Sequence, residues 1–425
     1  MRLIYSLIFY LIIPFVLLRL CWRSFAAPGY AKRWRERFGF VQSSSHNKKV
    51  IWIHTVSVGE FLGALPLIRE LQKKSDYRLW ITTTTATGSE RVVATLGDEV
   101  DHTYAPYDLP GSVSRFIHRV NPAMLIIMET ELWSNTVAIC NKNNIPSILV
   151  NARLSEKSAR GYARFSALTK PMLQDLSYVA VQQQKDAQRF FDLGLDSTHA
   201  EVTGNIKFDI SLNQDLQHKV QSLEKEWDIN ESRLVIIAAS THQGEDDIIL
   251  DAFAKVRAQE NTLCRSARLI IVPRHPERFN TVAQLCQQTG LSIVHRSTGE
   301  SFAQKDILVG DTMGELMMLY GVSDIAFVGG SLVARGGHNF IEPAAWSLSL
   351  QSGEHLFNFS EVSQLMLDAH ALKIVKSADE LADEWIHLLT NNELRKNRGD
   401  AAYQVVVNNR GALQKTLGIV ERFLV

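Results

Sequence analysis

The sequence predicts an α/β protein with two domains, each a parallel β-sheet covered by helices, preceded by an apolar segment. Three observations support this prediction. The chain has 425 residues, more than one hydrophobic core usually organises. Short apolar runs alternate with amphipathic stretches in both halves, as β-α-β units require. Residues 3–18 contain no charged side chain.

The balance of charged residues and the placement of the cysteines bear on the partners and the cellular compartment of the protein. The chain carries 45 basic and 45 acidic residues, and this balance gives no indication of a nucleic-acid partner. The cysteines are scattered, at positions Cys21, Cys140, Cys264 and Cys286. No pair has the spacing of metal ligands or of a disulfide framework. A reducing compartment therefore fits best.

The apolar segment predicts membrane attachment. As a helix, residues 3–18 would reach about 24 Å, short of the roughly 30 Å hydrocarbon core. Trp22 follows at the expected interface, and basic residues surround and follow it, at Arg19, Arg23, Lys32, Arg33, Arg35 and Arg37. This asymmetry favours a cytoplasmic location for the rest of the chain. A cleaved signal peptide is the alternative, with a weak cleavage site at 24–27, but the dense basic flank opposes export. We expect residues 1–23 to be an uncleaved anchor that spans the membrane or lies in its face.

The apolar runs define the expected strands and domain boundaries. They lie at residues 50–54, 78–82, 124–128, 147–150 and 178–181 in the first half, and at 234–239, 269–272, 291–294, 307–309 and 325–328 in the second. Residues 211–232 are polar and show no strand pattern, so we expect them to link a domain at 24–210 to one at 233–404. Ligands of parallel sheets bind beyond the carboxyl ends of the strands, so the residues at those ends are the candidates for function.

In the first half these ends carry carboxylates. Glu60 follows the first strand, at an expected helix start. Two interpretations of this position have equal support: a general base, or a carboxylate that is there because the helix dipole favours it. A run of threonines at 82–87 before Gly88 suits a sugar or phosphate, or simply caps a helix. Glu129 and Glu131 follow the third strand, and at least one of them is expected to be inert.

In the second half the strand ends carry basic residues and glycines. Arg274 and His275 follow one strand, and two glycine pairs lie between Val328 and Pro343. A strand, a glycine loop and a helix start can direct backbone N–H groups at an anion, although two tight turns explain the same glycines. Together the halves suggest a phosphate-bearing donor facing a base across a cleft.

Several short segments, spread through both halves, carry a resemblance to a known family. They are Ser57–Glu60, Thr130–Trp133, Asn151–Ser155, Gly204–Lys207, Ser240–His242, Pro273–Arg278, Gly310–Leu316 and Gly336–Asn339 with Glu342–Pro343. In these segments, and in their order along the chain, the sequence resembles the 3-deoxy-D-manno-octulosonic acid (Kdo) transferases of lipopolysaccharide assembly.

The resemblance implies a specific architecture and reaction. It implies the GT-B glycosyltransferase fold, with two Rossmann-like domains, a cleft between them, and a final helix at 405–425 crossing back to the first domain. It implies CMP-Kdo as donor and the 6′-hydroxyl of a tetraacylated lipid A precursor (lipid IVA) as acceptor. The transfer is expected to be inverting and independent of metals and cofactors. Glu60 would be the base, and Glu131 and Lys207 would support the transition state, on the cytoplasmic side of a bacterial inner membrane.

The resemblance also implies which residues bind the donor. The CMP-binding positions would be Pro273, Arg274, Met313, Gly314, Glu315, Asn339, Phe340, Ile341 and Glu342. Departures from the family pattern, at Ser134, Phe340 and Glu354, leave the geometry of individual loops open. The number of Kdo residues added, the acyl-chain preference and the oligomeric state are also left open.

Two other functions compete with this one. A membrane-anchored protein that binds a nucleotide sugar or lipid without catalysis would keep the CMP loops and would not need Glu60. An enzyme of the same fold could use a different nucleotide sugar, such as a UDP-sugar, although the motif at 273–278 argues against it.

Overall fold

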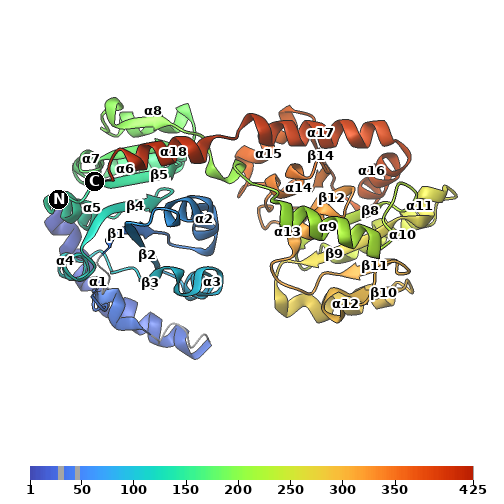
Figure 1. Ribbon diagram of the computed structural model, residues 1–425, viewed down its shortest axis with the longest axis horizontal. Coiled ribbons are helices and arrows are strands. Elements are labelled where there is room, and N and C mark those ends of the chain that lie inside the picture. The colour runs from blue at the N-terminus through green and yellow to red at the C-terminus, as the bar shows by residue number, and fades with distance from the viewer. Residues whose placement is uncertain (27–32, 44–47, 425) are drawn as a thin grey trace. The chain divides into compact units, whose positions relative to one another are not determined.

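The computed structural model describes residues 1–26, 33–43 and 48–424, and these form two compact units. The first unit contains Met1–Asp209 together with Asn409–Val425, and the second contains Ile210–Asn408 (Figure 1). Each unit is built around one parallel β-sheet with helices packed against it.

The first sheet has seven strands in the order β3-β2-β1-β4-β5-β6-β7, all parallel. They are β1 (Lys49–His54), β2 (Tyr77–Thr83), β3 (Asp101–Tyr104), β4 (Pro122–Met128), β5 (Ser147–Ala152), β6 (Tyr178–Val181) and β7 (Ala200–Val202). The order reverses between β1 and β4, the Rossmann-like switch point where ligands of such sheets bind. The sequence did not predict β3 and β7, because these edge strands are short and lack a run of apolar residues.

Helices connect these strands and cover the sheet. They are α2 (Val58–Gln72), α3 (Ala86–Leu96), α4 (Pro110–Val120), α5 (Ser134–Lys142), α6 (Glu156–Arg164), α7 (Ser166–Gln174) and α8 (Gln184–Asp192), with the short 3-10 turns η2 (Trp34–Phe38), η3 (Gly97–Glu99), η4 (Ser197–His199) and η5 (Ile206–Phe208). The final helix, α18 (Ala412–Glu421), also packs in this unit. The carboxylate of Asp209 accepts hydrogen bonds from the N–H groups of Gly411 and Leu413, at 2.7 Å each, which fixes the start of that helix.

The second sheet also has seven parallel strands, in the order β10-β11-β9-β8-β12-β13-β14. They are β8 (Val235–Thr241), β9 (Arg268–Pro273), β10 (Ile293–His295), β11 (Ile307–Val309), β12 (Ile325–Val328), β13 (Ser349–Ser352) and β14 (Leu372–Ile374). Every residue of β13 is buried although three of its four side chains are polar. That polarity is why the sequence did not reveal this strand.

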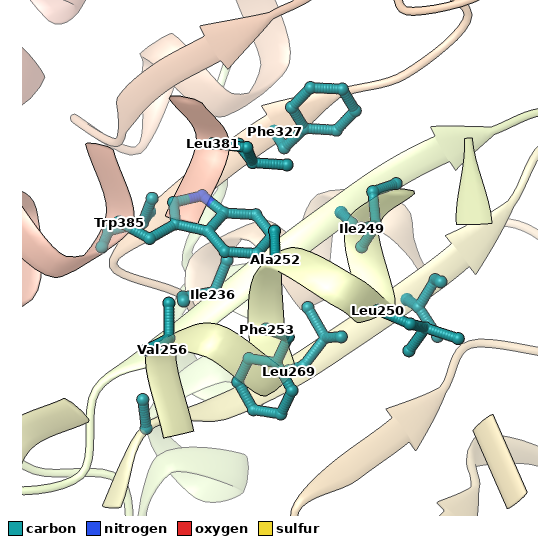
Figure 2. Packing of buried hydrophobic residues seen from close by; sticks show 14 of the residues in the cluster. Ile236, Ile249, Leu250, Ala252, Phe253, Val256, Leu269, Phe327, Leu381 and Trp385 are labelled. Atoms are coloured by element: carbon teal, nitrogen blue, oxygen red, sulfur yellow. The ribbon is translucent and has the colours of Figure 1, made fainter. Parts of the chain in front are cut away.

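The second unit has its own helices and core. The helices are α9 (Gln214–Glu226), α10 (Asp246–Arg257), α11 (Thr262–Ser266), α12 (Phe279–Gln288), α13 (Leu316–Gly321), α14 (Ile341–Ala345), α15 (Ser360–Asp368), α16 (Ala378–Thr390) and α17 (Asn392–Asn408), with η6 (Pro276–Arg278) and η7 (Arg296–Thr298). Figure 2 shows how side chains of α10 and α16, among them Phe253 and Trp385, gather with strand residues such as Ile236, Leu269 and Phe327.

Two expected boundaries differ from the structure. The segment 211–232, expected as a linker, contains helix α9, which packs against α13 inside the second unit. Its polar composition reflects a surface helix with only Val220 and Leu223 buried, not an extended connection. The chain returns to the first unit at Asn409, directly after α17, and not at residue 405 as the sequence predicts.

Helix α1 (Arg2–Ala26) precedes the first unit. Its segment Arg2–Trp22 is the one stretch of the described residues that is long and apolar enough to cross a membrane.

Candidate functional site

Glu60 lies at the first turn of α2, directly after β1 at the switch point of the first sheet. Its side chain is 8% exposed. One carboxylate oxygen accepts a hydrogen bond from the Val56 N–H at 2.7 Å, and the other accepts one from the Ser57 hydroxyl at 3.0 Å. The Ser57 hydroxyl in turn caps the helix by accepting from the Glu60 N–H at 3.4 Å. Glu60 therefore occupies the helix-start position in which the helix dipole favours a carboxylate, the alternative to a catalytic role.

The surroundings of Glu60 also raise the pKa of its carboxyl group. Burial, with a smaller contribution from the charges of Glu131 and Glu129, raises its pKa to about 7, against the opposing effect of the hydrogen bonds from Val56 and Ser57. A carboxyl group with a pKa near neutrality exchanges its proton readily at the pH of a cell. A group that only capped a helix would not need this environment.

Lys207 pairs with a carboxylate that the sequence did not single out. Its Nζ lies 2.9 Å from an Oε of Glu129, not of Glu131. Glu129 has a φ of +54°, a left-handed conformation that costs a non-glycine residue roughly 1–2 kcal/mol. Such strain commonly marks functional positions. Two carboxylates at the end of one strand were the available signal, but the family resemblance pointed to Glu131 and not to Glu129.

Neighbouring residues hold Lys207 in place. Asn151, at the end of β5, also has a left-handed φ of +54°, and its side-chain oxygen accepts from the Ile206 N–H at 3.1 Å. Asn205 accepts from the Lys207 N–H at 3.0 Å. The stem of Lys207 crosses α2 at Gly63, where an added Cβ would lie 3.1 Å from the lysine Cε. Glu60, Glu129 and Lys207 therefore converge at the start of one helix.

Glu131 is close enough to Glu60 for its charge to raise the Glu60 pKa. Burial raises the pKa of Glu131, Glu129 adds to the rise, and a hydrogen bond from the Trp133 side chain opposes it. Together with Trp133 and His54 it lines a cavity of about 10 Å³, about the room that one water molecule needs. His54 Nε2 is buried in that region without a protein partner, and burial lowers the His54 pKa to about 4.

In the second unit, the first glycine pair does not offer its N–H groups to a ligand. The fully buried carboxylate of Glu245 accepts from the N–H groups of Gly330, Ser331 and Leu332 at 2.7, 2.9 and 2.9 Å, and from that of His242 at 2.9 Å. An anion does bind this loop, as the glycine pattern suggested, but that anion is part of the protein. No motif in the sequence indicated this role of Glu245.

Arg274 is exposed beyond the end of β9 and belongs to a cluster of basic side chains. His242 and His338 are stacked with their Nε2 atoms 2.9 Å apart, and His275 contacts His242 edge-on at a centroid distance of 5.3 Å. Burial, followed by the charge of Arg274, lowers the pKa of His338 to about 3, and burial also lowers that of His242. The neutral imidazoles of His242 and His338 thus lie beside the Arg274 guanidinium, which suits a ligand that brings negative charge.

Other expected donor residues divide into two groups. The side-chain amide of Asn339 donates a hydrogen bond to Glu342 at 3.0 Å. Burial raises the pKa of Glu342, and the charge of Arg274 lowers it. Asn339 and Glu342 therefore lie near the basic cluster. Phe340, Ile341 and Pro273 are buried, and their side chains contribute to packing.

The remaining donor segment, 313–315, is an exposed loop. Met313 is 61% exposed, and Gly314 has a φ of +86° with no atom within 4 Å of where a Cβ would lie. Glu315 is paired with Arg296 through two hydrogen bonds, at 3.0 and 2.9 Å. The backbone and Met313 are thus accessible to a ligand, whereas the Glu315 carboxylate already has a partner.

The departures from the family pattern are accommodated locally. Ser134 is the first residue of α5, a position that favours proline but does not require it. Phe340 is fully buried before α14, and Glu354 is exposed with Lys376 3.8 Å away. Within the described residues, no group of three or more His, Cys, Asp or Glu side chains is placed to hold a metal ion.

Comparisons with known proteins identify the family. Residues 32–210 match the family model described as 3-deoxy-D-manno-octulosonic-acid transferase (kdotransferase). The chain is 41% identical over 427 residues to the 3-deoxy-D-manno-octulosonic acid transferase of Haemophilus influenzae, covering 100% of this chain and 99% of that protein. It is 33% identical to the enzyme of the same name from Bordetella pertussis, covering 88% and 87%.

The fold is shared with solved structures of much lower identity. A glycosyltransferase from Rickettsia africae superposes with a TM-score of 0.57 at 15% identity, covering 89% of this chain and 99% of that one. The UDP-GlcNAc 2-epimerase of Neisseria meningitidis superposes with a TM-score of 0.59 at 14% identity, covering 88% and 100%. The two Rossmann-like units of the present chain form the GT-B glycosyltransferase fold. Because the chain is 41% identical to the Haemophilus influenzae protein over its full length, it belongs to the Kdo transferase family.

Proposed function

We propose that this chain transfers Kdo from CMP-Kdo to the 6′-hydroxyl of a tetraacylated lipid A precursor, with Glu60 as the general base. The observation that carries this proposal is the environment of Glu60, a buried carboxyl group with a pKa of about 7 beside a lysine–glutamate pair. The relatives named above are Kdo transferases, and this supports the sugar that is transferred.

The base is needed because a sugar hydroxyl is a weak nucleophile. Glu60 in its ionised form would take the hydroxyl proton as the oxygen attacks the anomeric carbon of Kdo from the face opposite the phosphate. A new C–O bond forms, the bond from carbon to the phosphate oxygen breaks, and CMP leaves with the electron pair. Attack from the opposite face inverts the configuration at that carbon.

Lys207 and Glu131 would support this step from the same unit. Lys207, oriented by Glu129, places a positive charge near the reacting oxygens, where an oxyanion or the Kdo carboxylate would be stabilised. Glu131, whose pKa is raised by burial, would hydrogen-bond acceptor hydroxyl groups.

The leaving group would be stabilised by the second unit. Arg274 is exposed at a strand end, and the neutral His242–His338 pair beside it can donate a hydrogen bond without bringing a fixed charge. The 313–315 loop would contribute backbone N–H groups, and Glu342 with Asn339 would hydrogen-bond the ribose hydroxyls. No step uses a metal, and transfer in the presence of EDTA tests that prediction.

Attachment to the cytoplasmic face of an inner membrane would bring the enzyme to its lipid acceptor. Helix α1 is apolar over Arg2–Trp22, and Arg19 and Arg33 follow the pattern of cytoplasmic flanks.

The test compares the wild type with Glu60→Gln, and uses Glu90→Gln as a control, since Glu90 is exposed in the same unit. Detergent-solubilised protein receives CMP-Kdo and lipid A precursor, and glycolipid products are identified by mass spectrometry. We expect Glu60→Gln to abolish transfer and Glu90→Gln to retain it. Product masses also report how many sugars are added. Normal transfer by Glu60→Gln would reduce Glu60 to a helix cap and make Glu131 the next candidate.

Nucleotide binding separates this proposal from its competitors. CMP at a hundredfold excess over its Kd should stabilise the protein by about 2.7 kcal/mol, and both variants should retain this effect, whereas UMP should not produce it. Wild-type protein that binds CMP but never transfers Kdo would favour a non-catalytic binding protein. Stabilisation by UMP in place of CMP would favour a different nucleotide sugar.

A further inference from the structure

Helix α1 is attached to the first unit by its amino-terminal end. The Tyr5 hydroxyl donates to Asp108 at 2.8 Å, and the Ser6 hydroxyl donates to Asn135 at 3.1 Å. Asp108 is buried and also accepts from the N–H groups of Asn135 and Thr136, at 3.0 and 2.7 Å, at the start of α5. The first two turns of α1 therefore join a buried polar group of the catalytic unit, and Figure 1 shows the chain beginning beside α5.

The chain that follows α1 is also held by the same unit. Arg33 donates to the Ser89 hydroxyl at 3.2 Å and to the His102 carbonyl at 2.8 Å. Residues 27–32 separate it from the end of α1. Seven Cα steps reach at most about 25 Å, less than the roughly 30 Å of a hydrocarbon core.

These two attachments exclude a crossing in either direction. If the amino terminus lay on the far side of the bilayer, Tyr5 and Ser6 could not contact the unit. If the carboxyl end of α1 lay on the far side, the chain could not return to Arg33. The helix must therefore begin and end on one side.

The exposure of its side chains agrees with this geometry. One stripe of large apolar residues, at helical spacing, is between 60% and 86% exposed, and consists of Leu3, Leu7, Leu11, Phe15, Leu18 and Trp22. At 100° per residue, the opposite face holds the buried and half-buried positions, which are Tyr5, Ser6, Phe9, Ile13, Val16, Leu17 and Leu20. Six large apolar side chains in one exposed stripe mark a surface that is covered by an apolar partner.

We propose that α1 lies in the plane of a single membrane leaflet, with the stripe from Leu3 to Trp22 among the acyl chains, and does not cross the bilayer. This inference rests on the membrane attachment proposed above and specifies its form. The exposed Arg19 side chain beside the stripe can extend to lipid phosphates. The catalytic unit is then held flat against the leaflet that presents the sugar headgroup of its lipid acceptor.

The first test locates the amino terminus by cysteine labelling of the full chain in bacterial inner membranes. Cys21 is exposed and is replaced by serine, and the remaining cysteines are buried. Arg2→Cys is then exposed to a membrane-impermeant maleimide, with Glu90→Cys as the control on the catalytic unit. We expect both cysteines to react in inverted vesicles and neither to react in intact spheroplasts. Reaction of the position-2 cysteine from the outside overturns the proposal.

The second test detects the attachment itself. Ser6→Cys with Asn135→Cys should form an internal disulfide on oxidation in the membrane, whereas the matched pair Leu7→Cys with Asn135→Cys should not, because Leu7 faces away. Equal cross-linking of both pairs, or of neither, contradicts the docked helix. These variants do not alter the residues assigned to catalysis.

Carbonate extraction distinguishes membrane attachment itself from the in-plane position of α1. The full chain should remain with the membrane, and a chain lacking residues 1–22 should be released to a greater extent. Release of the full chain would refute membrane attachment and the in-plane helix together. Retention combined with outside labelling of position 2 would refute the in-plane helix alone.

Discussion

Replacing Glu60 by glutamine should stabilise the protein above neutral pH, although it removes the proposed base. Burial raises the pKa of Glu60 from an ordinary value of 4.5 to about 7. Between these values the folded protein keeps a proton on Glu60 that the unfolded chain has lost, so the free energy of unfolding falls as the pH rises. Glutamine does not ionise and therefore does not carry this cost.

The magnitude follows from the shift. A change of about 2.5 pH units at 1.36 kcal/mol each gives about 3 kcal/mol, fully present below pH 4.5 and lost above pH 7. The side chain is only 8% exposed, so solvent screening reduces this figure little. Relative to wild type, Glu60→Gln should gain up to about 3 kcal/mol between pH 4.5 and pH 8.

Urea unfolding of the detergent-solubilised wild type, Glu60→Gln and the exposed control Glu90→Gln across this pH range measures the effect. The difference between wild type and Glu60→Gln should grow with pH, while that of the control should not. The acid limb of kcat/KM for wild-type transfer should fall near pH 7, since it reports the pKa of the base in the free enzyme. A stability difference that is constant with pH, together with an acid limb near pH 4.5, would refute a buried Glu60 carboxyl group.

Two further substitutions test the structure around each site. Glu245→Gln should destabilise the second unit by about 3 kcal/mol. The amide NH₂ cannot accept hydrogen bonds from the N–H groups of Ser331 and Leu332, so these buried donors lose their partner. Thermal unfolding and CMP binding measure the loss. Gly63→Ala should lower kcat for transfer with little change in CMP affinity, because the new methyl group would lie 3.1 Å from the Lys207 Cε and displace the lysine; steady-state kinetics measure this change.

Each of these two predictions has a result that would contradict it. Glu277→Gln, at an exposed position of the second unit, is the control for Glu245→Gln. Equal unfolding temperatures for these two variants would show that the glycine loop does not depend on the buried carboxylate. For Gly63→Ala, an unchanged kcat would mean that Lys207 moves without consequence, and that its position is not important for transfer.

The sequence predicted the central strands of both sheets and the helix that begins at Glu60. These features are local, since a run such as 124–128 is apolar because both faces of its strand are covered, and Ser57 caps its helix within one turn. It also predicted the long apolar segment at the amino terminus, which forms helix α1. The family was predicted through motifs whose residue types are sufficient to identify it.

The tertiary structure decided which side chains meet. Lys207 lies 78 residues from Glu129, and a left-handed backbone at that residue, not composition, selects it over Glu131. Glu245 occupies the glycine loop more than 80 residues away, and Tyr5 joins Asp108 across 103 residues. Edge strands such as β7 exist because a neighbouring strand offers hydrogen bonds. The sequence by itself determined the strands with long apolar runs, the helix start at Glu60 and the apolar character of α1, because these depend on neighbouring residues. The partner of Lys207, the carboxylate in the glycine loop and the contact of Tyr5 with Asp108 depend on how distant segments pack together, which only the tertiary structure decided.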